Sequence, residues 1–160
     1  MGDTVTAVVR QRTIPESIRS LDTLPSDYAD VFTAPASDAA GTSPEGWARA
    51  ALEGASRVGR FIAWRMLLGL RLERRPAPGY IAGWRIVDRG ETWIRIEARS
   101  WFMTANIVFQ VDEGHVSFAT LIRYDRRIAA LVWTPVSAVH RRIAPDVLRG
   151  AVRRIDRSRS

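Results

Sequence analysis

Cysteine is absent from the sequence, which excludes disulfide bonds, thiolate metal ligands and cysteine nucleophiles. Histidine is scarce, because the 160 residues contain two of them, His115 and His140. Their spacing matches neither HxH nor HExxH, the patterns in which a histidine pair binds zinc. The GxGxxG fingerprint of a dinucleotide-binding loop is missing as well. We therefore expect neither a metal site nor a bound cofactor.

Lysine is also absent, so the 24 basic residues are all arginine, and with 17 acidic residues they give a net charge of +7. A basic surface binds nucleic acid or anionic membranes when its charges gather on one face. In this sequence the arginines alternate with apolar residues on the expected strands, and no aromatic and basic RNA-binding motif accompanies them. We therefore favour solvated arginine side chains, and nucleic acid is not an expected partner.

Long apolar runs are missing too. No segment approaches the roughly 18 apolar residues that a membrane-spanning helix needs. The first residues, Met1 to Val9, lack both the basic start and the continuous apolar core of a secretory signal. These absences lead us to expect a cytoplasmic protein without a transmembrane segment.

The length favours one domain, since a chain of this size buries roughly 70% of its unfolded surface on folding. Within the chain, residues 1–27 show no sustained hydrophobic period and are expected to form an irregular lead-in. Residues 28–156 contain the strongly patterned segments and should form the single domain. Residues 157–160 are expected to be a solvated basic tail.

The stretch from Thr134 to Arg154 has the pattern of an amphipathic helix that covers a sheet. Thr134 followed by Pro135 is typical of a helix start, with threonine as the N-cap and proline at the first helical position. At about 100° per residue, His140 falls near the middle of the apolar arc, so its imidazole is predicted to point at whatever the helix covers. The arc and its edge consist of apolar residues, namely Val136, Val139, Ile143, Ala144, Val147, Leu148, Ala151 and Ile155.

A proline interrupts this pattern at position 145. Inside a helix, proline removes one backbone hydrogen bond and clashes with the preceding turn, at a cost of about 3 kcal/mol if nothing adjusts. Pro145 lies opposite the apolar arc, however, so the carbonyl that it frees, that of Arg141, would face water. We favour one bent helix over two helices broken at Ala144, because alanine is a poor N-cap and the apolar phase continues. The outer face would carry Arg141, Arg142, Arg149 and Arg153.

The chain before this helix is expected to begin with a strand and two helices. The strand runs from Tyr28 to Phe32 and precedes a loop from Ala34 to Thr42, which is rich in alanine, serine, aspartate and glycine. The tripeptide Ser43 to Glu45 then supplies a hydroxyl cap, a proline and an acid, so a helix should start there and end near Gly54. A second helix is expected from about Ser56 to Leu70.

Four strands are expected after a connector from Arg74 to Gly79. Short polar turns separate them, which predicts an antiparallel meander. A short apolar piece, Ile128 to Trp133, then leads into the terminal helix. The four strands run from Ile81 to Val87, Thr92 to Phe102, Thr104 to Val111 and His115 to Tyr124.

This order predicts an α+β domain in which a curved antiparallel sheet wraps around a long kinked C-terminal helix, with two short helices after the first strand. Three segments carry a further signal: DYADVF, SPEGWARAALEGASRVGRFIAWRMLLGL and WTPVSAVHRRIAPDVLRGAVRR. With these segments, the chain from about Tyr28 to Arg154 resembles the helix-grip fold of the SRPBCC superfamily, the START-like and polyketide cyclase-like proteins. More narrowly, it is similar to an uncharacterised bacterial family of that superfamily, sometimes found fused to NAD-binding domains.

The resemblance implies a cavity between the terminal helix and the concave face of the sheet. Apolar walls with a few polar groups suit a small hydrophobic ligand, such as a lipid-, polyketide- or aromatic-like molecule. The alternative for each aromatic residue is packing in a filled core, and for His140 a buried imidazole bonded to one carbonyl or hydroxyl. The expected lining consists of Trp84, Ile96, Ala98, Phe109, Phe118, Thr120 and His140.

Three functions fit this sequence. Binding of a small hydrophobic ligand requires the cavity alone and is favoured. A cyclase- or dehydratase-like enzyme would use His140 as general acid or base with a second polar group facing it, from Thr120, Tyr124 or Asp125. Neither paired carboxylates nor a Ser-His-Asp set is evident, so no catalytic residue is assigned. The third function is binding of nucleic acid or an anionic membrane by the arginines.

Overall fold

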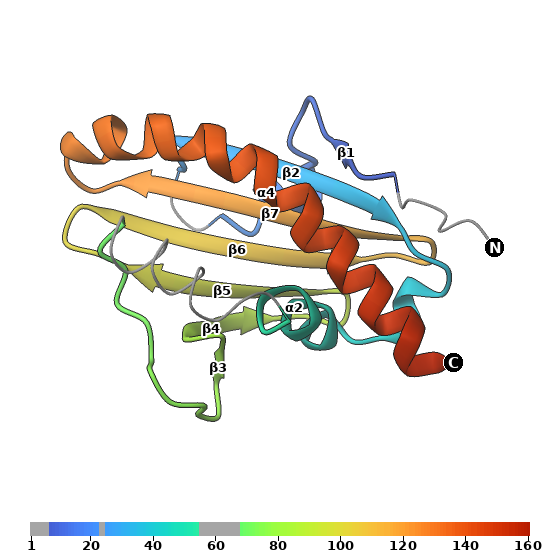
Figure 1. Ribbon diagram of the computed structural model, residues 1–160. Coiled ribbons are helices and arrows are strands. Elements are labelled where there is room, and N and C mark those ends of the chain that lie inside the picture. Colours follow the sequence, from blue (N-terminus) through green and yellow to red (C-terminus); the bar gives the residue numbers. More distant parts are fainter. Residues whose placement is uncertain (1–6, 23–24, 55–67) are drawn as a thin grey trace.

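The computed structural model describes residues 7–22, 25–54 and 68–160 of the chain. Its strands form one antiparallel, curved sheet in the order β1-β2-β7-β6-β5-β4-β3 (Figure 1). The expected α+β domain with a long C-terminal helix is confirmed at this level. The seven strands are β1 (Val9–Arg10), β2 (Tyr28–Pro35), β3 (Tyr80–Ile81), β4 (Trp84–Arg89), β5 (Trp93–Arg99), β6 (Met103–Val111) and β7 (His115–Tyr124).

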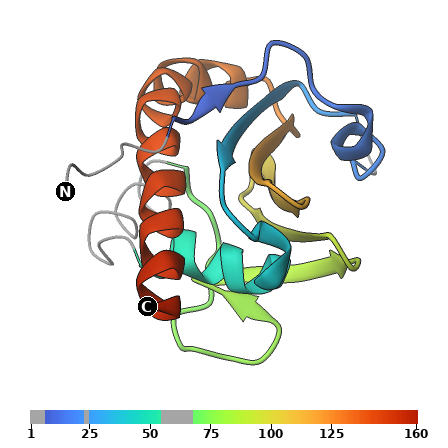
Figure 2. The ribbon, with the colours of Figure 1, turned by 90° about the vertical axis from the view of Figure 1, so that its right-hand side faces the viewer.

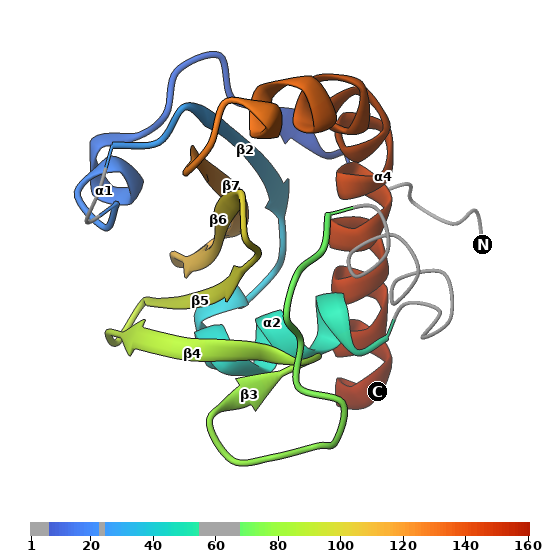
Figure 3. The same ribbon diagram turned by 90° about the vertical axis from the view of Figure 1, so that its left-hand side faces the viewer.

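Helices cover both faces of the curved sheet. The long helix α4 (Ile128–Arg159) and the shorter α2 (Pro44–Leu52) lie side by side on the concave face (Figures 1 and 2). On the convex face lies α1 (Glu16–Arg19), as the view from the other side shows (Figure 3). A short 3-10 helix, η1 (Ala39–Gly41), connects β2 to α2. The residues expected to form an irregular lead-in therefore include β1 and α1.

The alternation of side chains along β7 explains why two separate cores form. Phe118 faces α2 and α4 in the larger core, whereas Ala119 and Leu121 face α1 in a smaller one. Ile18 of α1 is fully buried in this smaller core. Because both faces are covered, the central strands β6 and β7 are buried over most of their length.

Helix α2 forms where its start signal predicts it. The Ser43 hydroxyl accepts a hydrogen bond from the backbone N–H of Gly46 at 3.0 Å, and proline occupies the first helical position. Trp47 is buried against the sheet, and its indole N–H donates to the carbonyl of Ala39 at 2.9 Å. The preceding strand is longer than expected, because β2 continues to Pro35 before the chain turns. The second predicted helix, Ser56 to Leu70, falls mainly on residues 55–67, which lie outside the described residues.

The strand predicted from Ile81 to Val87 is in fact the corner of a hairpin. Ile81 of β3 pairs with Trp84 of β4, and the two residues between them, Ala82 and Gly83, have φ angles of 51° and 89°. Two consecutive positive φ angles are typical of the tight turns that join antiparallel strands. The turn was not predicted because alanine rarely adopts a positive φ angle, as Ala82 does here.

Helix α4 begins earlier than predicted. Thr134 and Pro135 are not its start, since the helix already runs from Ile128, and the apolar piece Ile128 to Trp133 forms its first turns. The Thr134 hydroxyl donates to the carbonyl of Ala130 at 2.6 Å, a bond that threonine makes inside a helix. With Pro135 and Pro145 both inside it, α4 is one bent helix, as the favoured alternative predicted (Figure 1).

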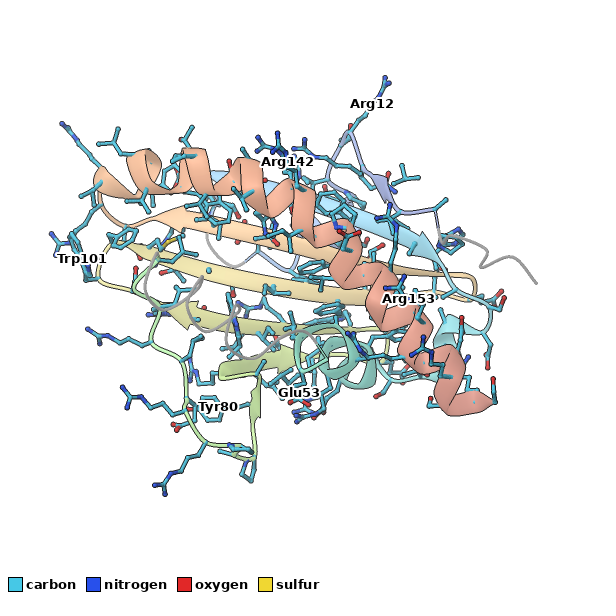
Figure 4. The ribbon with its side chains drawn as sticks, viewed as in Figure 1. Arg12, Glu53, Tyr80, Trp101, Arg142 and Arg153 are labelled. Carbon is cyan, nitrogen blue, oxygen red and sulfur yellow. The ribbon has the colours of Figure 1, made fainter. Side chains whose placement is uncertain are left out.

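The buried face of α4 is rotated from the predicted apolar arc. Val139 and Ile143 were expected to face the sheet, but they are 53% and 52% exposed. The buried residues of α4 include Ser137 and Gly150, two small residues that a search for hydrophobic side chains overlooks, whereas Ala144, Leu148, Ala151 and Ile155 are buried as predicted. Of the arginines expected outside, Arg142 and Arg153 do project from the exposed side (Figure 4), whereas Arg141 and Arg149 are partly buried.

Arg154 ties the end of α4 to the end of α2. Its guanidinium donates to the carbonyls of Ala50 and Gly54 at 2.6 and 2.7 Å, which lie at the C-terminal end of α2. We expect Arg154→Met to lower the free energy of unfolding by about 1 kcal/mol, because both bonds are lost at a solvent-exposed position.

Urea denaturation measures this effect, with Arg153→Met as the control. Arg153 is an exposed neighbour on the same helix, and its substitution should stay within about 0.5 kcal/mol of the unsubstituted protein. Equal stabilities of the two variants would show that the contact between the helices does not depend on Arg154.

Candidate functional site

A buried carboxylate marks the concave face of β2. Asp30 is 1% exposed, and it lies on the same face of the strand as Tyr28 and Phe32, which pack against the larger core. The Tyr28 hydroxyl donates to Asp30 Oδ2 at 2.5 Å. Asp30 Oδ1 has no hydrogen-bond partner among the described residues. A buried charged group with an unpaired oxygen is costly, so this position needs a physical explanation.

His140 reaches the same carboxylate from α4. Its Nε2 lies 3.2 Å from Asp30 Oδ2, and its side chain is 19% exposed. The N–H direction is not aligned for a hydrogen bond at this distance, so the contact is an ion pair when the imidazole is protonated. The prediction that His140 points toward the surface covered by the helix is therefore confirmed. Its partner, Asp30, was not predicted.

Aromatic rings surround this pair. The ring of Trp133 lies 5.6 Å from that of His140 and 5.2 Å from that of Tyr28, which it meets edge to face. The ring of Phe118 lies 6.3 Å from that of His140 and stacks on Phe109 at 5.0 Å. The carboxylate and the imidazole thus lie in apolar surroundings, where electrostatic interactions are stronger than in water.

Two further polar groups face this cluster without a partner among the described residues. Thr120 of β7 is paired directly with Asp30 in the strand register, so their side chains are neighbours about 5 Å apart at Cβ. The hydroxyl Oγ1 of Thr120 and the indole Nε1 of Trp133 are both buried and unbonded within the same part of the chain. Three elements, β2, β7 and α4, therefore bring unsatisfied polar atoms to one place.

The surroundings keep Tyr28 neutral. Burial raises the pKa of Tyr28 well above its usual range, and the hydrogen bond to Asp30 raises it further, whereas the nearby Arg141 guanidinium opposes both effects. Arg141 is itself held by a hydrogen bond from its Nη1 to Ser137 Oγ at 3.1 Å. Tyr28 is therefore a permanent donor to Asp30 at physiological pH.

The predicted lining residues divide into two groups. Phe118 lies next to His140 and stacks on Phe109, and Thr120 is paired with Asp30, the residue that His140 contacts. Trp84, by contrast, is on β4, four strand spacings from β2 or about 19 Å along the sheet. All the predicted strand residues are buried on the concave side, namely Trp84, Ile96, Ala98, Phe109, Phe118 and Thr120.

Sequence reasoning missed three members of the cluster, namely Tyr28, Asp30 and Trp133. A signal for Asp30 was present in DYADVF, because a charged residue occupies an inward position between Tyr28 and Phe32. Asp125, proposed as a partner for His140, does not have that role. It accepts hydrogen bonds from Thr104 and Arg123, at 2.7 Å each.

His115 is the first residue of β7, and its side chain is solvent-exposed. No group of three histidine, aspartate or glutamate side chains suited to a metal ion occurs in the described part of the chain. No described helix is long and apolar enough to cross a bilayer; in the 32-residue α4, arginines interrupt the apolar residues.

No family model, curated protein or solved structure matches this chain.

The raised pKa of Tyr28 predicts a specific loss of stability in alkali. In the unfolded chain Tyr28 ionises near pH 10, its ordinary value, whereas in the folded protein it keeps its proton to higher pH. The folded state then binds more protons than the unfolded state, so the free energy of unfolding falls as pH rises above 10. Tyr28→Phe should remove this contribution.

Urea denaturation from pH 8 to pH 11.5 tests the prediction, because each protein serves as its own reference at pH 8. The unsubstituted protein should lose stability more steeply above about pH 10 than Tyr28→Phe. If the free energies of unfolding of the two proteins fell in parallel above pH 10, the raised pKa of Tyr28 would be contradicted.

Proposed function

We propose that the protein binds a small hydrophobic molecule between the concave face of the sheet and α4. The observation that carries this proposal is the set of buried, unsatisfied polar atoms of Asp30, Thr120 and Trp133 within aromatic walls. Buried polar groups in folded proteins nearly always have partners. A few converging polar groups in apolar surroundings are what a binding site for a small molecule presents.

The arrangement of the chain supports the same proposal. A curved sheet that holds one long helix along its concave face is the layout of the helix-grip fold, and we propose that the chain has this fold and belongs to the SRPBCC superfamily. In such a layout the inner face is where a ligand is enclosed. The cluster of Asp30 and His140 lies on that face, next to β7.

Native mass spectrometry of the protein purified from cells tests this function. We expect an adduct in stoichiometric amount that disappears on denaturation and that extracts as a small apolar compound. Thr120→Phe should abolish the adduct, because a larger apolar ring would replace the unpaired hydroxyl that faces Asp30.

The matched control is Ser117→Phe on the same strand. Ser117 points to the convex side and bonds with Thr33 there, so its substitution should leave the adduct in place. Thermal unfolding confirms that both variants fold. A protein that carries no adduct and is not stabilised by any apolar compound would contradict the proposal.

The contact between Asp30 and His140 favours a second function, acid–base catalysis on the bound molecule. Asp30 Oδ2 lies 3.2 Å from His140 Nε2, so a carboxylate stands directly beside an imidazole that could gain or lose a proton. This arrangement suits a proton transfer, as in a cyclase- or dehydratase-like reaction, with His140 as the general acid or base. The binding function does not require this step.

Turnover of the extracted ligand would test the catalytic role. His140→Asn should lower kcat on the order of 100-fold or more, since it removes the proton-transferring group. Asp30→Asn should retain part of the activity, because the proton-transferring imidazole is still present while the carboxylate 3.2 Å from its Nε2 is lost. A turnover unchanged in His140→Asn would exclude this role.

A further inference from the structure

This inference rests on the binding function proposed above and concerns the polar group of the ligand. The facing pair Asp30 and Thr120 indicates which polar group fits. The two residues are direct partners across β2 and β7 and point to the same side of the sheet. Neither bonds the other: Asp30 Oδ1 and Thr120 Oγ1 are both without a partner among the described residues. A group placed between them could bond both.

The opposite oxygen of the carboxylate is already in use. Asp30 Oδ2 accepts the hydrogen bond of Tyr28 and lies 3.2 Å from His140 Nε2. Oδ1 is thus the oxygen left for a ligand, and the Tyr28 bond holds the carboxylate in a fixed orientation. Trp133 adds a buried, unbonded indole N–H from the helix side, next to both Tyr28 and His140.

The bonding capacity of these atoms defines the group that fits. A carboxylate oxygen accepts hydrogen bonds, an indole N–H donates them, and a threonine hydroxyl does both. The ligand group must therefore donate to Asp30 and accept from Trp133 and Thr120. A hydroxyl does this with its one hydrogen and two lone pairs.

The geometry points to a hydrophobic alcohol or phenol as the ligand of this site, with its hydroxyl between Asp30 and Thr120. Other common polar groups fit less well. A carboxylate ligand would meet the negative charge of Asp30, an ether or ketone has no hydrogen to donate, and an ammonium group has no lone pair to accept. An alkane would leave every polar atom of the cluster unpaired.

Calorimetric titration with matched eight-carbon probes tests this inference. The probes are 1-octanol, its isomer 1-methoxyheptane and octanoate, so that chain length is nearly constant while the polar group changes. We expect 1-octanol to bind about 10-fold or more tightly than either of the others, the usual effect of one unsatisfied buried partner.

Two variants assign the preference to the facing pair. Thr120→Val keeps the shape of the side chain and removes its hydroxyl, so it should weaken 1-octanol binding about 5-fold and leave 1-methoxyheptane less affected. Asp30→Asn removes the negative charge and should therefore narrow the difference in binding affinity between 1-octanol and octanoate. Ser117→Ala, on the other face of β7, is the control and should bind all three probes as the unsubstituted protein does.

The outcomes separate this inference from the function on which it rests. Equal or tighter binding of 1-methoxyheptane or octanoate would overturn the alcohol assignment while supporting a hydrophobic site. A preference for 1-octanol that persists in Thr120→Val and Asp30→Asn would overturn the assignment to this pair. Absence of binding by all three probes, together with a protein purified without an adduct, would overturn the binding function itself.

Discussion

The packing of α4 along the concave face of the sheet is the contact on which the rest of the structure depends. The helix contributes Trp133, Ala144 and Leu148 to the same core as strands β2 to β7 and helix α2. Two prolines interrupt its hydrogen bonding, and the bend lets one continuous helix follow a curved surface. The same packing brings His140 to Asp30, so the shape of the core and the candidate site have one cause.

Some of the arginines stabilise the packing of α4. Arg154 holds the end of α2, and Arg159 donates to the carbonyls of Ser37 and Asp38 in the connection before that helix. Arg159 is therefore structural, although residues 157–160 were expected to form a solvated basic tail, and α4 itself continues to this residue. Arg49 stabilises α2 itself, because it forms ion pairs with Glu45 and Glu53, which lie one turn away on either side.

The elements that could be predicted from the sequence are those whose signal is local. The capping residues of α2 and the alternation along β5 to β7 depend on neighbouring residues, and both gave the correct elements. The predicted start of α4 was wrong, because Thr134 and Pro135 match the pattern of a cap inside a longer helix. Its buried face was predicted in part, because Val139 and Ile143 are exposed whereas Ala144, Leu148, Ala151 and Ile155 are buried as expected. His140 was identified from the helical pattern, but its partner Asp30 could not be, since the pairing depends on how distant elements meet.

The sequence separation within the cluster also determines when the site can exist. Asp30 belongs to an early strand and His140 to the helix that follows every strand in the chain. The carboxylate and the imidazole can therefore come together only after α4 has been synthesised and has packed against the sheet.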